Sequence, residues 1–336
     1  MLLGEIAGIA SAALWACSSL IMAGLTRRMP ALALSTLRLC LGVCFYACLL
    51  VATGNVNAML HVGWGLAAAL AGSAVLAMGF GDTLYIMGMR LVGVSKASPI
   101  SVTTYPLLAV VLAWLLLGEA MSVRIVAGTA LILGGIVLVV ARTGRVIVMA
   151  EPAPEFELVV AGSVFRADPV VAGGLVRVAA VATPMPSPDS LTHNPERAWV
   201  GIAMVLIASV TWAISTIWLR VLTEHTNLVV VNSVRVPAAA LFLGSIAAGQ
   251  GMLDLRRYRR RDLGLVAAAG IVGSGLGSLL YVYALREVGA GLSSLLNSLS
   301  PVFALPMAAW LLGERITKLT VAGTLVALLG LSLVIS

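Results

Sequence analysis

Long apolar runs, separated by short polar turns, make up most of the chain. Each run is close to the length of about 20 residues that a helix needs to cross the hydrocarbon core of a bilayer. The ten predicted segments are 6–25, 32–53, 65–88, 94–117, 123–141, 198–219, 228–248, 263–285, 289–312 and 317–335. The expected fold is therefore an all-α polytopic membrane protein with ten transmembrane helices.

The stretch 142–197, between the fifth and sixth segments, differs from the rest of the chain. It holds five arginines, six acidic residues and a cluster of prolines, so it cannot span a membrane. Two short runs, Arg145–Met149 and Phe156–Val160, favour a hairpin outside the bilayer, and a disordered linker is an equal alternative. The expected organisation is a five-helix unit over 1–141, an extramembrane insert or linker over 142–197 and a second five-helix unit over 198–336.

Residues recur between the two halves at a nearly constant separation. The matched pairs are Trp15 with Trp212 and Arg38 with Arg235 at 197 residues, Tyr85 with Tyr281 and Gly93 with Gly289 at 196, and Pro106 with Pro301 and Glu119 with Glu314 at 195. Because each unit has an odd number of predicted spans, the second must enter the membrane from the opposite side. The pattern predicts two inverted five-helix repeats, as in secondary transporters.

Each half also follows one order of features, over 84–135 and 280–330. An aromatic-rich segment leads into a basic residue, a serine-rich helix, a proline, a Gly-Glu pair and a final span with glycines. This order resembles the EamA repeat of the drug/metabolite transporter superfamily, and the resemblance covers both halves but not 142–197. It implies ten helices around a central cavity and the export or import of small metabolites, without indicating which solute.

Composition supports a membrane location. Hydrophobic residues make up 60% of the chain and charged residues 10%, whereas soluble domains have roughly 25% charged residues. The net charge of +7 resides mostly in short loops, the usual flank of membrane spans. We therefore expect a multi-pass protein of the cell (inner) membrane in contact with lipid, with no nucleic-acid partner; the sequence indicates no oligomeric state.

The basic residues are divided unequally between alternate loops. Sixteen lie in the set that includes 142–197 and the run Arg256–Arg261, and three lie in the set that shares a side with both termini: Arg124, Arg220 and Arg286. The positive-inside rule places the first set in the cytoplasm and both termini outside. The resemblance implies cytoplasmic termini, and we favour the charge count.

Three ionisable residues, Arg38, Asp82 and Arg235, lie within predicted spans. Each costs about 2.5–3.5 kcal/mol on insertion scales, so such groups face a cavity or a partner. The two arginines are equivalent between the halves, and a structural role and solute contact stay open for both. Asp82 has no acidic counterpart. It is a candidate for proton coupling or solute binding, with a snorkelling group near a helix end as the alternative, and passive exchange is the alternative to proton antiport.

An organic solute needs aromatic walls and a few polar groups. The candidate substrate-binding residues are Trp15, Asp82, Tyr85, Tyr105, Trp212, Tyr281, Tyr283 and Asn297, with Ser98, Ser101 and Ser298 as further hydrogen-bonding groups. Packing within the bundle is the alternative for each of them. The predicted helices 94–117 and 289–312 are the expected walls of the path.

Catalytic motifs are incomplete in this sequence. Gly79-Phe80-Gly81-Asp82 has the order found in intramembrane aspartyl proteases, but no second carboxylate lies in a predicted span. Ser274 lies between glycines, and no histidine is placed to serve as its base. We expect no catalytic residues, no metal site and no cofactor. The alternatives to a carrier are an intramembrane enzyme acting on a lipid or isoprenoid, a channel, and a sensor that uses 142–197.

Two further patterns carry structural predictions. Cys40, Cys44 and Cys48 recur every four residues on one helix face, which we interpret as a small-residue packing face rather than a soft-metal stripe. Glu119 and Glu314 each follow a glycine at the end of a span. They are expected to fix the turn into the next helix.

Overall fold

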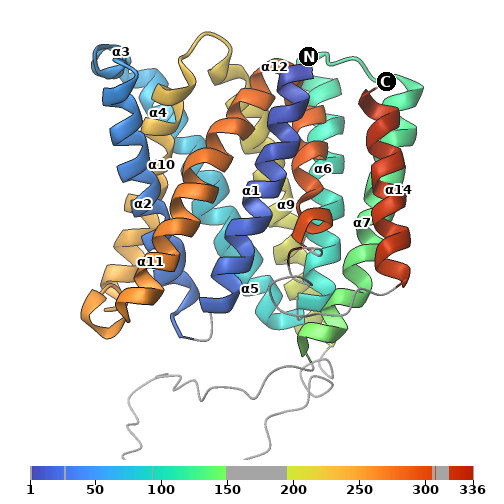
Figure 1. Cartoon of the computed structure of the whole chain (residues 1–336). Coiled ribbons are helices and arrows are strands. Elements are labelled where there is room, and N and C mark those ends of the chain that lie inside the picture. Colours follow the sequence, from blue (N-terminus) through green and yellow to red (C-terminus); the bar gives the residue numbers. More distant parts are fainter. Residues whose placement is uncertain are drawn as a thin grey trace, which may run out of the picture.

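The structure is a computed structural model of the chain and describes residues 2–25, 28–92, 94–148, 195–304, 307 and 318–335. Within these residues every regular element is helical and no strand occurs. The helices lie side by side in a bundle, with the two chain ends on one face (Figure 1). The prediction of an all-α fold is confirmed.

The helices of the first half follow the predicted apolar segments closely. They are α1 (Leu2–Leu25), α2 (Ala31–Ala52), α3 (Val56–Leu60), α4 (Trp64–Ala74), η1 (Val75–Gly81), α5 (Asp82–Val92), α6 (Val94–Leu117) and α7 (Val123–Val148). The predicted span 65–88 thus comprises three consecutive elements, α4, η1 and α5.

The second half repeats this arrangement. Its elements are α9 (Pro195–Thr223), α10 (Leu228–Gly249), η2 (Leu255–Arg257), α11 (Arg260–Ala269), η3 (Gly270–Gly277), α12 (Ser278–Ser298) and α14 (Lys318–Ile335). Within α12, Gly289 has φ 87° and ψ 174°, which breaks the helix between the predicted spans 263–285 and 289–312. Because φ is positive there, glycine is the residue that fits.

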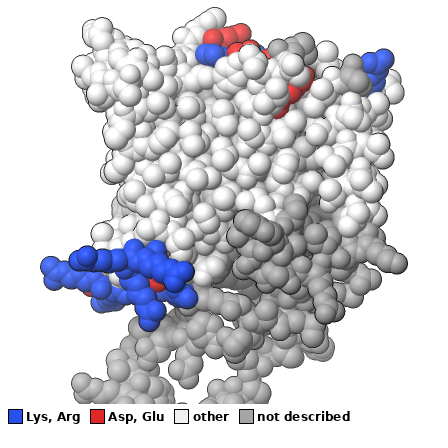
Figure 2. All heavy atoms as spheres, in the orientation of Figure 1, with Lys and Arg blue, Asp and Glu red and all other residues white. Residues whose placement is uncertain are grey.

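Seven of the described helical stretches are long and apolar enough to cross a membrane, and Val123–Leu138 and Val321–Ile335 are shorter apolar helices. Large apolar side chains point outward, such as Leu241, which is 75% exposed. An uncharged band separates the charged residues at the two ends of the bundle (Figure 2). Such a surface suits lipid rather than water, and the chain is a polytopic membrane protein.

The two halves interlock. Helix α1 packs against η3 and α12 of the second half, and α9 packs against η1, α5 and α6 of the first half. Helices α2 and α10 contact each other, as do α7 and α14. Helices α7 and α14 approach each other closely, since a Cβ added at Gly128 would lie only 2.8 Å from the carbonyl oxygen of Gly330. Glycine allows such close contacts between helices in membranes.

Two π-helices, η1 and η3, lie at corresponding places in the two halves. The hydropathy pattern did not predict them. Both are rich in glycine, and π-turns frequently occur at functional sites. η1 ends directly before Asp82, and η3 ends directly before Ser278.

Two predictions need correction. Residues Arg145–Val148 belong to α7 and are helical rather than part of a hairpin strand, whereas Phe156–Val160 lies outside the described residues. Cys40, Cys44 and Cys48 are exposed on the surface of α2, so this face does not pack against another helix of the described chain. The outer surface of a membrane bundle is as apolar as its core, and the sequence pattern does not separate the two.

Candidate functional site

A hydrogen-bonded pair from the two halves, Asp82 and Trp212, is at the centre of the site. The indole Nε1 of Trp212 in α9 donates to Oδ1 of Asp82 at 3.0 Å and to the carbonyl oxygen of Ala77 at 3.1 Å. A Cβ at Gly81 would lie 2.5 Å from that indole nitrogen. Glycine is therefore required at position 81 for the indole to reach the carboxylate.

Two tyrosines pack around the same indole. The ring of Tyr85 in α5 lies 5.4 Å from Trp212 between ring centroids. The ring of Tyr105 in α6 lies 6.1 Å away and meets the indole edge-on. Residues far apart in sequence thus form one aromatic cluster next to a carboxylate, and its polar edges can contact an organic solute.

Three hydroxyl groups extend this cluster toward α12. The hydroxyl of Tyr105 lies 3.1 Å from that of Tyr281 and 3.2 Å from Oγ1 of Thr216. Tyr281 and Thr216 are themselves 3.2 Å apart. Any of the three oxygens can donate or accept, so the triangle can rearrange its hydrogen bonds around a bound molecule.

Both intramembrane arginines lie beside this region. Arg235 in α10 is 4% exposed, and its Nε donates to Oγ of Ser73 at 3.2 Å. It is close enough to interact electrostatically with Tyr105 and Tyr281. Its hydrogen bond to Ser73 therefore links α10 to α4.

Arg38 in α2 occupies the equivalent place in the first half. Its guanidinium carbon lies 5.3 Å from the ring centroid of Trp15, a cation–π contact. Arg38 interacts electrostatically with Asp82 but makes no direct ion pair with it. Its Nε is buried without a hydrogen-bond partner in the described part of the chain, so a donor is available to an added group.

Two predicted residues lie apart from this cluster. The ring of Tyr283 packs against Arg286, with 5.9 Å between the guanidinium carbon and the ring centroid. Arg286 in turn contacts Glu287 at 3.6 Å. Asn297 lies further along α12, and its Oδ1 is buried without a partner among the described residues.

The three serines predicted as further hydrogen-bonding groups differ in their surroundings. Ser101 is buried, Ser298 Oγ donates to the carbonyl oxygen of Leu295 at 2.7 Å, and the side chain of Ser98 lies outside the described residues. The sequence missed Thr216 and Ser73 as members of the site. A hydroxyl one turn after Trp212 on the same helix face was the available signal for Thr216.

One pair of hydrogen bonds recurs in both halves. Ser18 Oγ donates to the carbonyl oxygen of Ala269 at 2.9 Å, and Ser215 Oγ donates to that of Ser73 at 2.7 Å. The donors are 197 residues apart and the acceptors 196, the separations of the matched sequence pairs. Each bond connects the first helix of one half to a residue just before the π-helix of the other.

Glu119 acts across the two halves. Its carboxylate accepts hydrogen bonds from the backbone N–H of Ala290 at 2.6 Å and of Gly291 at 3.0 Å. These residues follow the break at Gly289 and begin the second part of α12. Glu119 thus caps a helix of the other half, a contact that differs from the predicted role in the turn into the next helix. Glu314 lies outside the described residues.

Comparisons with known proteins give the family. The EamA-like transporter family matches residues 2–141 and 199–336. The "Probable terminal-alkyne amino-acid exporter" of Streptantibioticus cattleyicolor is 35% identical over 130 residues, which cover 39% of this chain and 43% of that protein. The match thus spans less than half of the relative's length.

A solved structure titled "Crystal structure of protein" superposes on the chain with a TM-score of 0.71 at 15% identity, covering 98% of this chain and 96% of that one. At this identity the likeness concerns the fold alone. The family match extends over nearly all of both halves, and its members move small molecules across membranes. The chain belongs to the EamA-like transporter family.

Proposed function

We propose that the chain carries a small organic solute by alternating access, with the Asp82–Trp212 cluster as the region that contacts the solute. The observation that supports this proposal most directly is the hydrogen bond between these two residues, which joins the two halves at an intramembrane carboxylate. Charged groups within a bilayer are costly and normally serve a transport path or a partner. The aromatic rings and hydroxyls around them supply the remaining contacts.

The fold in this proposal is ten transmembrane helices in two inverted repeats, 1–141 and 198–336, joined by 142–197. Its support is the constant separation of matched residues and the recurrence of the Ser18 and Ser215 hydrogen bonds. The corresponding π-helices add to this support. Two related halves that interlock can rock against each other around a central site. The location we propose is the cell (inner) membrane.

The solute class we propose is an amino acid with an apolar side chain. Asp82 and Arg38 offer charges of both signs in one region, and an amino acid presents an ammonium and a carboxylate group. The ammonium would lie near Asp82 and the aromatic faces, where cations are favoured. The carboxylate would accept from Arg38, whose Nε is unpartnered among the described residues. The name of the Streptantibioticus relative, an amino-acid exporter, supports this class.

The energy source we propose is a proton gradient acting through Asp82. A carboxylate loses its charge when it binds a proton, and Oδ1 of Asp82 accepts the hydrogen bond from Trp212. Binding of a proton would weaken that bond and the attraction to Arg38. Proton binding would thus be coupled to the contact between the two halves. The direction of transport that we propose is export.

Proteoliposomes loaded with unlabelled amino acid test this function. Saturable accumulation of radiolabelled leucine or phenylalanine by counterflow supports a carrier for this class. Uridine and glucose serve as solute controls, and liposomes without protein as the blank. Flux that does not saturate would indicate a channel, and chemical conversion of the solute would indicate an enzyme. Absence of counterflow for every amino acid would contradict the proposed solute class.

A further inference from the structure

Six exposed arginines gather where α11 begins, on the face opposite the two chain ends (Figures 1 and 2). They are Arg28, which follows α1, and Arg256, Arg257, Arg259, Arg260 and Arg261. Part of the cluster lines a cavity of about 400 Å³, formed by Arg28, Arg257, Tyr258, Arg259 and Asp262. We call this cavity the basic pocket.

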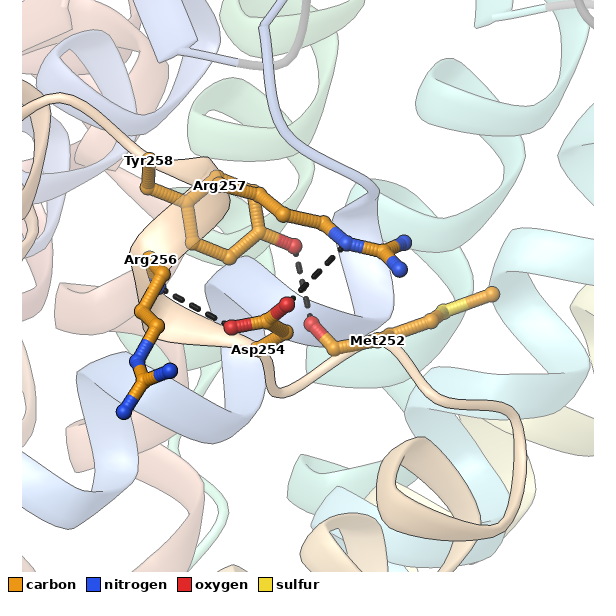
Figure 3. A network of polar contacts seen from close by, with 5 residues as sticks. All are labelled: Met252, Asp254, Arg256, Arg257 and Tyr258. Atoms are coloured by element: carbon orange, nitrogen blue, oxygen red, sulfur yellow. Dashed lines mark hydrogen bonds and ion pairs between the residues drawn. The ribbon is translucent and has the colours of Figure 1, made fainter.

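The two acidic residues of the cluster already have partners. Asp262 is 3% exposed and its Oδ1 pairs with Nη1 of Arg28 at 2.9 Å. Oδ2 of Asp254 pairs with Nε of Arg257 at 3.2 Å, and its Oδ1 accepts from the backbone N–H of Arg256 at 3.1 Å (Figure 3). Four arginine side chains remain without a carboxylate partner in the described residues: Arg256, Arg259, Arg260 and Arg261.

The loop that carries these charges is held in place. The hydroxyl of Tyr258 donates to the carbonyl oxygen of Met252 at 2.8 Å, which closes the turn between α10 and α11 (Figure 3). The pair between Arg28 and Asp262 ties this loop to the end of α1. The pocket residues are thus connected to the turn after α10 and to the end of α1 by these two contacts.

The start of α11 adds to the attraction for an anion. Arg259 occupies its N-cap position and makes no side-chain capping bond. The first N–H groups of a helix lack intrahelical partners, and their dipoles favour negative charge. Asp262 in the first turn offsets part of this effect, but its charge is neutralised by Arg28.

Exposed apolar side chains follow the pocket residues along α11 and η3. Leu265, Ile271 and Leu276 are each about two-fifths exposed there, at 39%, 42% and 41%. A free phosphate would use only the arginines, whereas a phospholipid would use both surfaces. We propose that the basic pocket binds the phosphate-bearing headgroup of an anionic phospholipid, with its acyl chains along α11 and η3. Basic clusters at a membrane boundary favour such lipids.

The test uses the full chain in neutral detergent, titrated with dioleoyl phosphatidylglycerol and followed by native mass spectrometry. The variant Arg257→Gln/Arg259→Gln removes two pocket charges, and Arg220→Gln/Arg286→Gln removes two arginines of the opposite loop set. We expect the Kd for phosphatidylglycerol to rise at least about tenfold in the pocket variant and to stay within about twofold in the control.

Three outcomes would overturn the proposal. They are equal binding of dioleoyl phosphatidylcholine, equal loss in the control variant, and full displacement of the lipid by inorganic phosphate, which would assign the pocket to free phosphate. If the double variant does not yield folded protein, Arg259→Gln alone replaces it, since Arg259 is exposed and has no carboxylate partner. The test measures lipid binding and is independent of the proposed solute.

Discussion

Trp212 and Asp82 are hydrogen-bonded at 3.0 Å although they lie 130 residues apart and in different halves of the chain. The equivalent residues of the other half are Trp15 and Ser278. Trp15 lies against the glycine before Ser278, with 3.2 Å between a Cβ built on Gly277 and Cδ1 of the indole. One scaffold therefore carries a carboxylate on one side and a hydroxyl on the other, and the difference makes Asp82 the functional candidate.

Replacing Asp82 with asparagine tests proton coupling. Asp82→Asn retains an acceptor for Trp212 but cannot bind and release a proton. We expect transport driven by a pH gradient to fall at least about tenfold. Counterflow exchange at saturating solute should persist with a higher KM, because asparagine is a weaker partner for the ammonium group of the solute than a carboxylate is. Both rates are measured in the same proteoliposomes.

The control for this substitution is Ser278→Ala, at the equivalent position in the second half. It removes the donor to Oδ1 of Asn232 at 3.3 Å but no titratable group. pH-driven flux should persist in it. Undiminished pH-driven flux in Asp82→Asn would show that the proton does not pass through this carboxylate.

Tyr281 and Tyr283 form a matched pair for the solute site. Tyr281→Phe removes one oxygen of the hydroxyl triangle, whereas Tyr283→Phe changes a residue that packs on Arg286. A lost hydrogen bond costs about 0.5–1.5 kcal/mol, so we expect solute affinity to fall about two- to tenfold in Tyr281→Phe alone. Isothermal titration with the transported amino acid gives both values, and equal losses would place the triangle outside the site.

Replacing Trp15 with alanine tests whether this residue contacts the solute or only packs within the bundle. Trp15→Ala removes the aromatic face that Arg38 lies over. If this face contacts the solute, affinity should fall more than the yield of folded protein does. Unchanged affinity with poor yield would assign Trp15 to packing.

The helical architecture could be predicted from hydropathy, because a bilayer requires long apolar segments. The π-helices could not, since hydropathy does not record which carbonyl each N–H reaches. Tyr281 and Tyr283 were grouped by residue type, yet positions two apart on a helix point in different directions. Only Tyr281 joins the cluster. The partner of Glu119 was missed because it lies in the other half, 171 residues away.

Glu119 offers a test of contact between the halves. Glu119→Ala leaves the N–H groups of Ala290 and Gly291 without their acceptors next to the break at Gly289. Loss of a helix cap costs about 0.5–2 kcal/mol. We expect a lower thermal midpoint in detergent, with Glu224→Ala, at an exposed glutamate after α9, as the control. Equal midpoints would mean that the cap contributes nothing measurable.

The orientation of the chain in the membrane is the remaining prediction. Arg28 is paired with Asp262, so the loop after α1 and the start of α11 share one face. On the other face, Gly4 lies against Glu287, and Asn55 accepts from Asn227 at 3.0 Å. The arginine cluster and the chain ends are thus on opposite sides (Figures 1 and 2).

Cysteine labelling from outside the cell tests which of two orientations is correct, the one predicted by the charge distribution or the one implied by the resemblance. The four native cysteines are replaced, and single probes are placed at Asn57 in α3, on the face of the chain ends, and at Leu255 in η2, beside the arginines. Because basic loops are retained in the cytoplasm, an impermeant maleimide should modify the probe at 57 and spare the probe at 255. Both probes should react after the membrane is permeabilised, which controls for accessibility. Modification at 255 and not at 57 would place both termini in the cytoplasm, as the resemblance implies, and would show that loop charge does not set the orientation of this chain.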